Sequence, residues 1–499
     1  MFKKTGLAAL LLLLAILVTA CGDKEGPGTE TTPGGATQEQ TNAQGETLDV
    51  PNVMYDETIR VYVKGGEYAD EIYPEARDGG AERVKEQVVR RNTTLLELYG
   101  IEFEYTQSLN AFNTDALTLL RGGEDVYDIM QCHGRSAYSY AGEGLVLDWN
   151  TLPNLSLEKS WWNQSAREYL TICGVLPAMT GEIGYSSLGG GTGVVFNKTV
   201  FQDAGISADT VYGLVDSGDW TFDAMYGYAT QLTGDLNGDG NITNTDDRIG
   251  FTSTWWSAPI QVLYSTGSTV IAFDEAGKPG FNFYNADVIE AFDKLLDLFN
   301  SDYGYCYNED DPSNNRRAFS QNQAAMMSTA MQALGTSFFL NSEVDFGVLP
   351  YPKYDSDVEK YYSVVDAASA LYVVPRTVPT ERREMIGAVL ESLAYYGQKY
   401  LMPEYYGYLL TSRYLKDDVS ARMLDYVYEG CTYDLGYYNT DEFGGSYASI
   451  GYELVKNPGQ TFTNYYRQYY AAMDQKLDDA YAKYQGLAAG QNAADSGAA

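Results

Sequence analysis

Two hydrophobic periodicities take turns along this chain, and their order constrains the fold more than any other feature of the sequence. Residues 58–63 alternate apolar and polar side chains as a strand does, whereas residues 82–99 place apolar side chains near helical spacing. Gly100 ends the predicted helix, and a second alternating segment follows at residues 101–105. A strand, helix, strand order is typical of a mostly parallel sheet that helices cover.

The same order recurs further along the chain. Residues 113–120 show helical spacing and lead into a short apolar strand at 126–130, and residues 193–196 have the pattern of another strand. Thr221 is placed to cap a helix that extends to about Leu232. With 499 residues, of which 44% are hydrophobic, the chain is long enough to build two cores. We therefore expect an α/β fold with two lobes.

The amino terminus has the parts of a bacterial export signal. Lys3 and Lys4 precede an unbroken apolar run at residues 7–18, and small residues follow the run before Cys21. The run holds 12 residues, fewer than the roughly 20 that a membrane-spanning helix needs. We therefore expect residues 1–20 to be a cleaved signal peptide.

The segment Val18–Cys21 resembles a bacterial lipobox, which implies that Cys21 receives a lipid and becomes the first residue of the mature chain. The alternative is a free cysteine that happens to lie at a cleavage site. Residues 21–49 are rich in Gly, Thr, Pro, Gln and Glu and almost lack large apolar side chains, so we expect them to form a flexible tether.

Charge and cysteine content exclude several partners and scaffolds. The 33 basic and 68 acidic residues give a net charge of -35, which becomes -37 when Lys3 and Lys4 leave with the signal peptide. Such a negative field opposes binding to nucleic acids and to anionic lipid surfaces. Four further cysteines are too few and too scattered for a disulfide framework, and their pairing stays open: Cys132, Cys173, Cys306 and Cys431.

Several short motifs follow the lipobox in a fixed order. They are VYDIM at 126–130, GEGLVLD at 142–148, FNK at 196–198, DWTFD at 219–223, Phe319 with AAMM at 324–327, and DFGVLP at 345–350. In their order and spacing the chain resembles the extracellular solute-binding proteins of carbohydrate ABC importers.

This resemblance implies a two-lobe, periplasmic-binding-protein-like fold of type II, with a ligand cleft between lobes that the chain crosses more than once. The implied crossings lie near residues 174–177 and 363–370. The implied first lobe is 50–176 plus about 371–396, the second is 177–362 plus about 397–485, and 486–499 form a flexible tail. The resemblance also implies a monomer on the outer face of the bacterial cytoplasmic membrane, which captures a sugar or oligosaccharide and delivers it to a transmembrane permease.

A loop in the implied second lobe has the spacing of a calcium-binding loop. Calcium prefers oxygen ligands at loop positions 1, 3, 5, 7 and 12, with glycine at position 6. Those ligand positions hold Asp235, Asn237, Asp239, Asn241 and Asp246. Position 12 carries Asp instead of the longer Glu, and Asp247 could take its place. The pattern predicts a structural Ca²⁺, and the alternative is an acidic surface turn.

Ligands of open α/β sheets lie beyond the carboxyl ends of the strands. The loops after the strands at 126–130 and near Phe251, together with the two implied crossings, supply side chains that can stack on a sugar or bind its hydroxyl groups. The predicted ligand-binding residues are Gln131, His133, Arg135, Trp162, Trp255, Trp256 and Asp366. Each tryptophan could instead be packed in the core, and we expect one of each tandem pair, Trp161–Trp162 and Trp255–Trp256, to face the cleft. His133 and Arg135 could equally be structural.

An enzyme is the main alternative from another class. A secreted glycoside hydrolase would also be acidic and rich in aromatic residues, and it needs only two carboxylates. His133 is the only histidine. A helical zinc protease motif needs two histidines and is therefore excluded, and any Ser-His-Asp triad would have to use His133. The sequence also lacks a Gly-x-Ser-x-Gly elbow and a phosphate-binding Walker sequence. We therefore expect a binding protein without catalytic residues.

Overall fold

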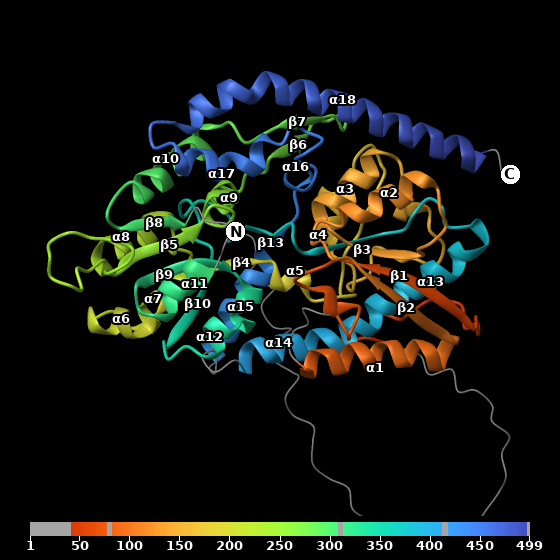
Figure 1. Cartoon of the computed structure of the whole chain (residues 1–499), viewed down its shortest axis with the longest axis horizontal. Coiled ribbons are helices and arrows are strands. Elements are labelled where there is room, and N and C mark those ends of the chain that lie inside the picture. The colour runs from red at the N-terminus through yellow and green to blue at the C-terminus, as the bar shows by residue number, and fades with distance from the viewer. Residues whose placement is uncertain (1–40, 77–81, 308–312, 412–417, 497–499) are drawn as a thin grey trace, which may run out of the picture. The chain divides into compact units, whose positions relative to one another are not determined.

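The computed structural model describes residues 41–76, 82–307, 313–411 and 418–496. Its α/β architecture contains a four-stranded sheet in the order β12-β3-β1-β2, and a five-stranded sheet in the order β10-β4-β9-β5-β8 (Figure 1). We call them the first and the second sheet.

The first sheet joins three consecutive parallel strands to one that returns from much later in the chain. Its strands are β1 (Glu57–Val63), β2 (Ile101–Gln107), β3 (Ile129–His133) and β12 (Ala370–Val373). β1 pairs in parallel with β2 and β3, whereas β12 pairs antiparallel with β3. The helices around it are α1 (Glu82–Tyr99), α2 (Thr114–Gly122), α3 (Gly134–Gly142), α4 (Gln164–Tyr169), α13 (Thr380–Tyr396) and α14 (Met402–Thr411).

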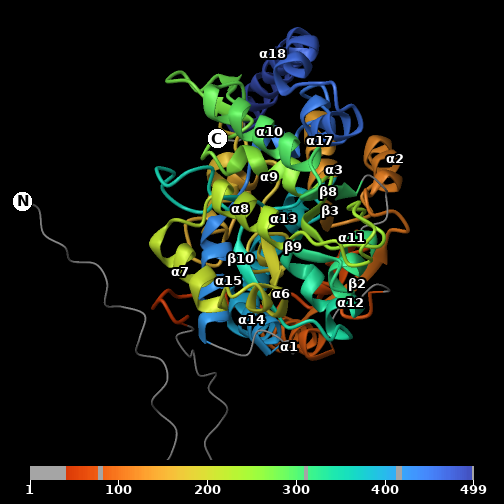
Figure 2. The same ribbon diagram turned by 90° about the vertical axis from the view of Figure 1, so that its left-hand side faces the viewer.

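The second sheet is mixed. Its strands are β10 (Phe346–Pro350), β4 (Thr192–Asn197), β9 (Ala324–Ala330), β5 (Ile249–Thr254) and β8 (Gly304–Tyr307). β5 pairs in parallel with β8 and β9, and β4 pairs antiparallel with β9 and β10. The helices around it are α6 (Lys198–Asp203), α7 (Ala208–Ser217), α8 (Phe222–Leu232), α9 (Ala258–Tyr264), α10 (Ala286–Phe299), α11 (Ser313–Ser320), α12 (Ser337–Leu340) and α15 (Asp418–Gly430), and α7 and α15 lie against β10 (Figure 2).

Local sequence signals placed several of these elements accurately. α1 spans Glu82–Tyr99, and Gly100 follows it in the left-handed region at φ 66, which favours glycine. The Thr221 side chain caps α8 by accepting from the backbone N–H of Ala224 at 3.3 Å. These predictions are confirmed. They could be made from the sequence because caps and periodicity depend on a few neighbouring residues.

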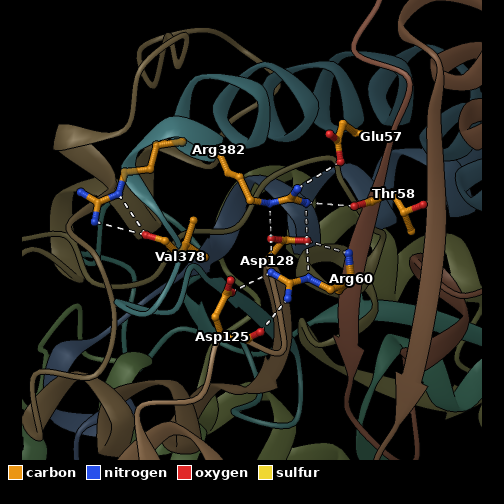
Figure 3. Close-up of polar contacts among 8 residues, drawn as sticks. Glu57, Thr58, Arg60, Asp125, Asp128, Val378 and Arg382 are labelled. Atoms are coloured by element: carbon orange, nitrogen blue, oxygen red, sulfur yellow. Dashed lines mark hydrogen bonds and ion pairs between the residues drawn. The ribbon is translucent and has the colours of Figure 1, made fainter.

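β3 begins at Ile129, three residues later than predicted. Asp128, just before it, forms an ion cluster with two arginines. Its buried carboxylate accepts from Arg60 of β1, with Nε at 3.0 Å, and from Arg382 of α13, with Nε and Nη2 both at 3.0 Å (Figure 3). Burial opposes ionisation, but the two guanidinium groups lower the pKa of Asp128 below its usual value. This ion cluster ties the returning helix α13 to the first sheet.

Contacts between distant residues mark the passages between the sheets. Met179 still pairs with Tyr372 of β12, so the chain leaves the first sheet after this point and reaches β4 through α5 (Ser186–Gly189). This bridge lies two residues beyond the crossing implied near residues 174–177, and the lobe boundary stays a prediction. On the return, α14 packs against α1, so the segment beside the first sheet continues past residue 396.

The described residues at both predicted flexible ends are ordered instead of flexible. Thr41 and Thr47 form a bridge, and this end of the predicted tether binds the body of the protein, since Asn42 Nδ2 donates to Gln398 Oε1 at 2.8 Å. At the other end, α18 (Phe462–Ser496) continues through most of the predicted tail, with Leu487 packed against the core. Polar side-chain hydrogen bonds hold the segment that begins at Thr41, and an alanine-rich sequence favours helix at the end of α18.

The remaining elements lie near the two sheets. They are a hairpin of β6 (Ile271–Phe273) and β7 (Pro279–Phe281), the pair β11 (Ser363–Val364) and β13 (Cys431–Thr432), and the helices α16 (Leu435–Tyr438) and α17 (Ser446–Lys456). The cysteines Cys132, Cys173, Cys306 and Cys431 are free thiols. None of the helices in the described ranges has the length and apolar character that crossing a membrane requires.

Candidate ligand-binding cavity

A cavity of about 300 Å³ lies at the carboxyl ends of β3 and β5. Its lining comes from both sheets and from the segment that leads from β11 to β12. The aromatic lining residues are Tyr68, Phe112, Trp255, Trp256 and Tyr437, and the charged ones are Glu67, Arg135, Arg316 and Asp366. Aromatic faces combined with a few polar groups are typical of small-molecule sites.

On the side of the first sheet, the end of β3 turns directly into α3. The Nδ1 atom of His133 accepts from the backbone N–H of Arg135 at 3.2 Å and so caps that helix. Burial lowers the pKa of His133 well below its usual value, so the ring is neutral near pH 7. The Phe112 ring lies 4.6 Å from the His133 ring, and the Arg135 guanidinium lies 5.5 Å from the ring centre of Tyr437.

On the side of the second sheet, the tandem pair Trp255–Trp256 follows β5. Their rings are perpendicular, at 88°, with centres 5.2 Å apart. Trp255 also contacts Tyr452 of α17 edge to face, at 5.5 Å. Asn315 reaches the same cavity from α11 and is almost completely buried. These residues give this wall both aromatic surface and amide groups.

Asp366 lies between the two sides. Its backbone N–H donates to the carbonyl of Gly190 at 3.0 Å, and its Oδ1 accepts from the N–H of Ala368 at 2.7 Å. Burial raises the pKa of this carboxyl above its usual value. Glu67, which is exposed, contributes a second carboxylate to the lining. The cavity therefore offers acceptors for hydroxyl groups as well as donors.

Comparison with solved structures identifies the architecture around this cavity. The sequence matches no known family model and no curated protein. Its fold is similar to that of a Thermotoga lettingae ABC transporter solute-binding protein bound to α-D-tagatose, with a TM-score of 0.53 and 14% identity over 85% of this chain and 100% of that chain. The chain has the solute-binding-protein fold.

Two further structures share the solute-binding-protein fold. The GacH receptor of Streptomyces glaucescens, solved with and without acarbose, has a TM-score of 0.53 and 12% identity over 86% of this chain and 98% of that chain. The maltose/maltodextrin-binding domain MalE of Bdellovibrio bacteriovorus, bound to maltotriose, has a TM-score of 0.50 and 15% identity over 87% and 99%. All three neighbours are binding proteins rather than enzymes.

Within this fold the cavity collects five of the seven residues predicted to bind ligand: His133, Arg135, Trp255, Trp256 and Asp366. It does not collect Gln131, whose amide donates to the carbonyl of Tyr68 at 2.8 Å and to Glu71 at 3.1 Å inside the first lobe. Nor does it collect Trp162, whose Nε1 donates to the buried carboxylate of Glu391 at 2.8 Å. The polar atoms of both side chains are directed inward.

Sequence reasoning missed several lining residues, and only some of them left a signal. Phe112 follows β2 at the same edge of the first sheet, so the rule about carboxyl ends of strands could have found it. Asn315, Arg316 and Tyr437 come from helices, and nothing in their local sequence distinguishes them from other helical residues.

The predicted calcium loop lies between α8 and β5. Asp235 accepts from the N–H groups of Gly238 and Gly240, at 2.6 and 2.8 Å, which folds the loop around its first ligand position. Asp247, which is buried, accepts from Leu236 N and Thr243 N at 2.9 Å each and closes the loop.

Asn237, Asp239, Asn241 and Asp246 complete the predicted ligand set on the exposed side of this loop. In the described ranges, no three His, Cys, Asp or Glu side chains are gathered to hold a metal ion. The oxygen donors fit calcium in chemistry, although the structure does not bring three carboxylates together, and calcium binding stays a prediction.

Proposed function

We propose that this chain is an extracellular substrate-binding protein that captures a sugar or small oligosaccharide and delivers it to the permease of an ABC transporter. The observation that carries this proposal is the cavity itself, which combines Trp255 and Trp256 from the second sheet with His133 and Arg135 from the first. A ligand that contacts both walls favours approach of the two lobes through its differential affinity for the closed state.

A carbohydrate suits the chemistry of the lining. Ring faces such as that of Trp256 can cover the C–H face of a sugar, while the carboxylates of Glu67 and Asp366 accept its hydroxyl groups. The neighbouring structures were solved with α-D-tagatose, acarbose and maltotriose, which supports the same ligand class for this chain.

We propose further that a lipid on Cys21 anchors the mature chain, as a monomer, to the outer face of the bacterial cytoplasmic membrane. Cys21 and the predicted signal peptide lie outside the described residues. Cys21→Ala should release the protein from the membrane fraction or block its maturation. If that variant still fractionated with lipid, the lipoprotein assignment would be wrong.

For the loop 235–246 we propose a structural Ca²⁺. Asp235, Asn237, Asp239 and Asp246 would supply side-chain oxygens and Asn241 a backbone carbonyl. When bound, the ion would neutralise acidic groups and fasten the loop to the fold. We do not expect it to contact the ligand.

A glycoside hydrolase is the second candidate function. Glu67 and Asp366 place two carboxylates at one cavity, and the raised pKa of Asp366 is what a general acid requires. The same cavity could therefore serve hydrolysis, and only the fate of the sugar separates the two functions.

The decisive experiment follows the ligand and the protein together. The purified chain is screened by thermal unfolding against D-tagatose, maltose and maltotriose, because a ligand that binds only the folded state raises the midpoint. With a sugar that binds, we expect the radius of gyration in solution scattering to decrease and the sugar to be recovered intact after long incubation. Release of cleaved sugar above the rate without protein would instead assign the chain to the hydrolases.

A further inference from the structure

Three buried side-chain atoms that border the cavity have no hydrogen-bond partner in the described structure. They are Nε of Arg135, Nε1 of Trp255 and Oδ1 of Asn315. Arg135 lies in the first turn of α3 beside the first sheet, Trp255 follows β5, and Asn315 lies in α11. A buried polar atom without a partner costs free energy, and native proteins rarely leave three at one place. The two N–H groups need acceptors and the amide oxygen needs a donor. A ligand that satisfies all three therefore supplies two hydrogen-bond acceptors and one donor.

The geometry of the tandem tryptophans assigns a different role to each ring. Perpendicular rings 5.2 Å apart set the edge of one ring against the face of the other, so the two rings lie at different angles to a ligand in the cavity. Trp255 contacts both Trp256 and Tyr452, and it keeps an unpaired N–H at the cavity. Trp255 is thus placed to donate a hydrogen bond from its edge, which leaves Trp256 to offer its face.

The lining carries basic and acidic side chains in equal number. Arg135 and Arg316 bring two guanidinium groups, while Glu67 and Asp366 bring two carboxyl groups, and His133 is neutral. A cavity that receives a charged ligand needs a net charge of opposite sign, because the ligand loses hydration on entry. This balance favours an uncharged ligand with several hydroxyl groups.

We infer that the cavity selects an uncharged sugar, whose oxygens accept from Trp255 and Arg135, whose hydroxyl donates to Asn315, and whose ring lies against the face of Trp256. The inference rests on the proposed function and adds the charge of the ligand and the division of labour between the tryptophans. The volume of about 300 Å³ lies at the lower end of the range of roughly 300–1,000 Å³ for small-molecule sites, which suits a short sugar.

The charge of the ligand is tested with matched probes. Calorimetric affinities are measured for glucose, glucosamine and glucuronic acid, and for D-tagatose, maltose and maltotriose. We expect a neutral sugar to bind at least about tenfold more tightly than either charged one. Tighter binding of glucosamine or glucuronic acid would overturn the inference while leaving sugar capture intact, whereas the absence of binding by every sugar would overturn the proposed function as well.

The roles of the tryptophans are tested with phenylalanine, which keeps an aromatic face but has no N–H. With the neutral sugar that binds best, Trp255→Phe should raise Kd about tenfold or more, because one ligand oxygen loses its donor. Trp256→Phe should raise Kd by no more than about threefold, whereas Trp256→Ala should raise it about tenfold or more.

Two controls keep this test decisive. Asn315→Leu should raise Kd about tenfold, since the ligand hydroxyl loses its acceptor. Asn314→Leu, at a half-buried position of the same helix outside the cavity lining, serves as its match. Each variant is checked for an unchanged unfolding midpoint without sugar, and if Trp255→Phe unfolds it is replaced by Trp255→Met, which likewise has no hydrogen-bond donor. Equal effects of Trp255→Phe and Trp256→Phe, or the reverse order, would overturn the assignment of edge and face.

Discussion

The same dipeptide occurs twice in this protein, with opposite environments. In Trp161–Trp162 both side chains are buried, with exposed fractions of 0% and 2%. Their indole N–H groups both donate to Glu391, at 3.0 and 2.8 Å. In Trp255–Trp256 both side chains are partly exposed at the cavity, and the N–H of Trp255 has no hydrogen-bond partner among the described residues.

One carboxylate explains the difference. Glu391 lies in α13, about 230 residues beyond the first pair, and takes two indole donors together with the backbone N–H of Ser156 at 3.1 Å. Burial raises the pKa of Glu391, while its three donors oppose that shift. A buried donor needs an acceptor, so the pair with Glu391 belongs to the core, whereas the second pair keeps a donor for a ligand.

The largest effect should come from removing the shared acceptor. Glu391→Ala leaves two buried indole N–H groups and one partly buried backbone N–H without their acceptor, and it should lower the free energy of unfolding by about 3–5 kcal/mol, measured by urea denaturation. Glu384→Ala, at an exposed position of the same helix, is the matched control and should change it by less than about 0.5 kcal/mol. A loss below about 1 kcal/mol for Glu391→Ala would show that the first pair does not depend on this carboxylate.

Next in size is the direct contrast between the pairs. Trp162→Phe removes a buried hydrogen bond and packing against Trp149, whose ring centre is 5.6 Å away, and should cost about 2–3 kcal/mol. Trp256→Phe should cost less than about 1 kcal/mol, because its side chain is only partly buried. Urea denaturation of both variants without sugar measures the contrast, and similar losses would mean that both pairs are core elements.

A smaller effect concerns pH and the surroundings of the first pair. Trp162 borders a small cavity of about 20 Å³ together with Glu182, and burial raises the pKa of Glu182 from 4.5 to about 7, against the effects of Tyr428 and Gln398. The folded protein therefore binds this proton more tightly than the unfolded chain does. The resulting stabilisation is complete below about pH 4.5 and is lost as the pH rises through 7.

Other groups also titrate between pH 4.5 and 7, such as Asp434, whose pKa burial raises to about 6. The variant Glu182→Gln separates the stabilisation due to Glu182 from theirs. We expect the variant to gain stability relative to the wild type as the pH increases from 4.5 to 7, measured as unfolding midpoints across that range. A constant difference between the two proteins over this range would contradict the assignment.

The smallest effect concerns the loop that leads into β5 and the second pair. Calcium should raise the unfolding midpoint by a few degrees, and the double variant Asp235→Ala with Asp239→Ala should abolish that response, since two anionic ligands are lost. Asp203→Ala with Glu275→Ala, at two exposed acidic positions, is the control and should keep the response. If the loop variant responded like the wild type, the ion would bind elsewhere.

Much of the fold was predictable because its signals are local. The helix α1, its end at Gly100, and the cap of α8 at Thr221 depend on residues within one or two turns of each other. The two-lobe fold followed from the order of such elements and from the family resemblance, and structural comparison confirms it. Most of the sites predicted after strand ends also lie at the cavity, because strand direction itself orders that edge of a sheet.

The sequence alone could not determine which polar groups form hydrogen bonds with each other across distant segments. Nothing near Trp162 reveals that Glu391 will accept a hydrogen bond from its indole N–H, nothing near Asn42 predicts its bond to Gln398, and nothing in α11 marks Asn315 as part of a cavity wall. Periodicity and capping arise within a single segment, so the order of residues determines them. Burial and hydrogen-bond partnership arise between segments hundreds of residues apart, so only the packed tertiary structure determines whether a tryptophan completes the core or faces a ligand.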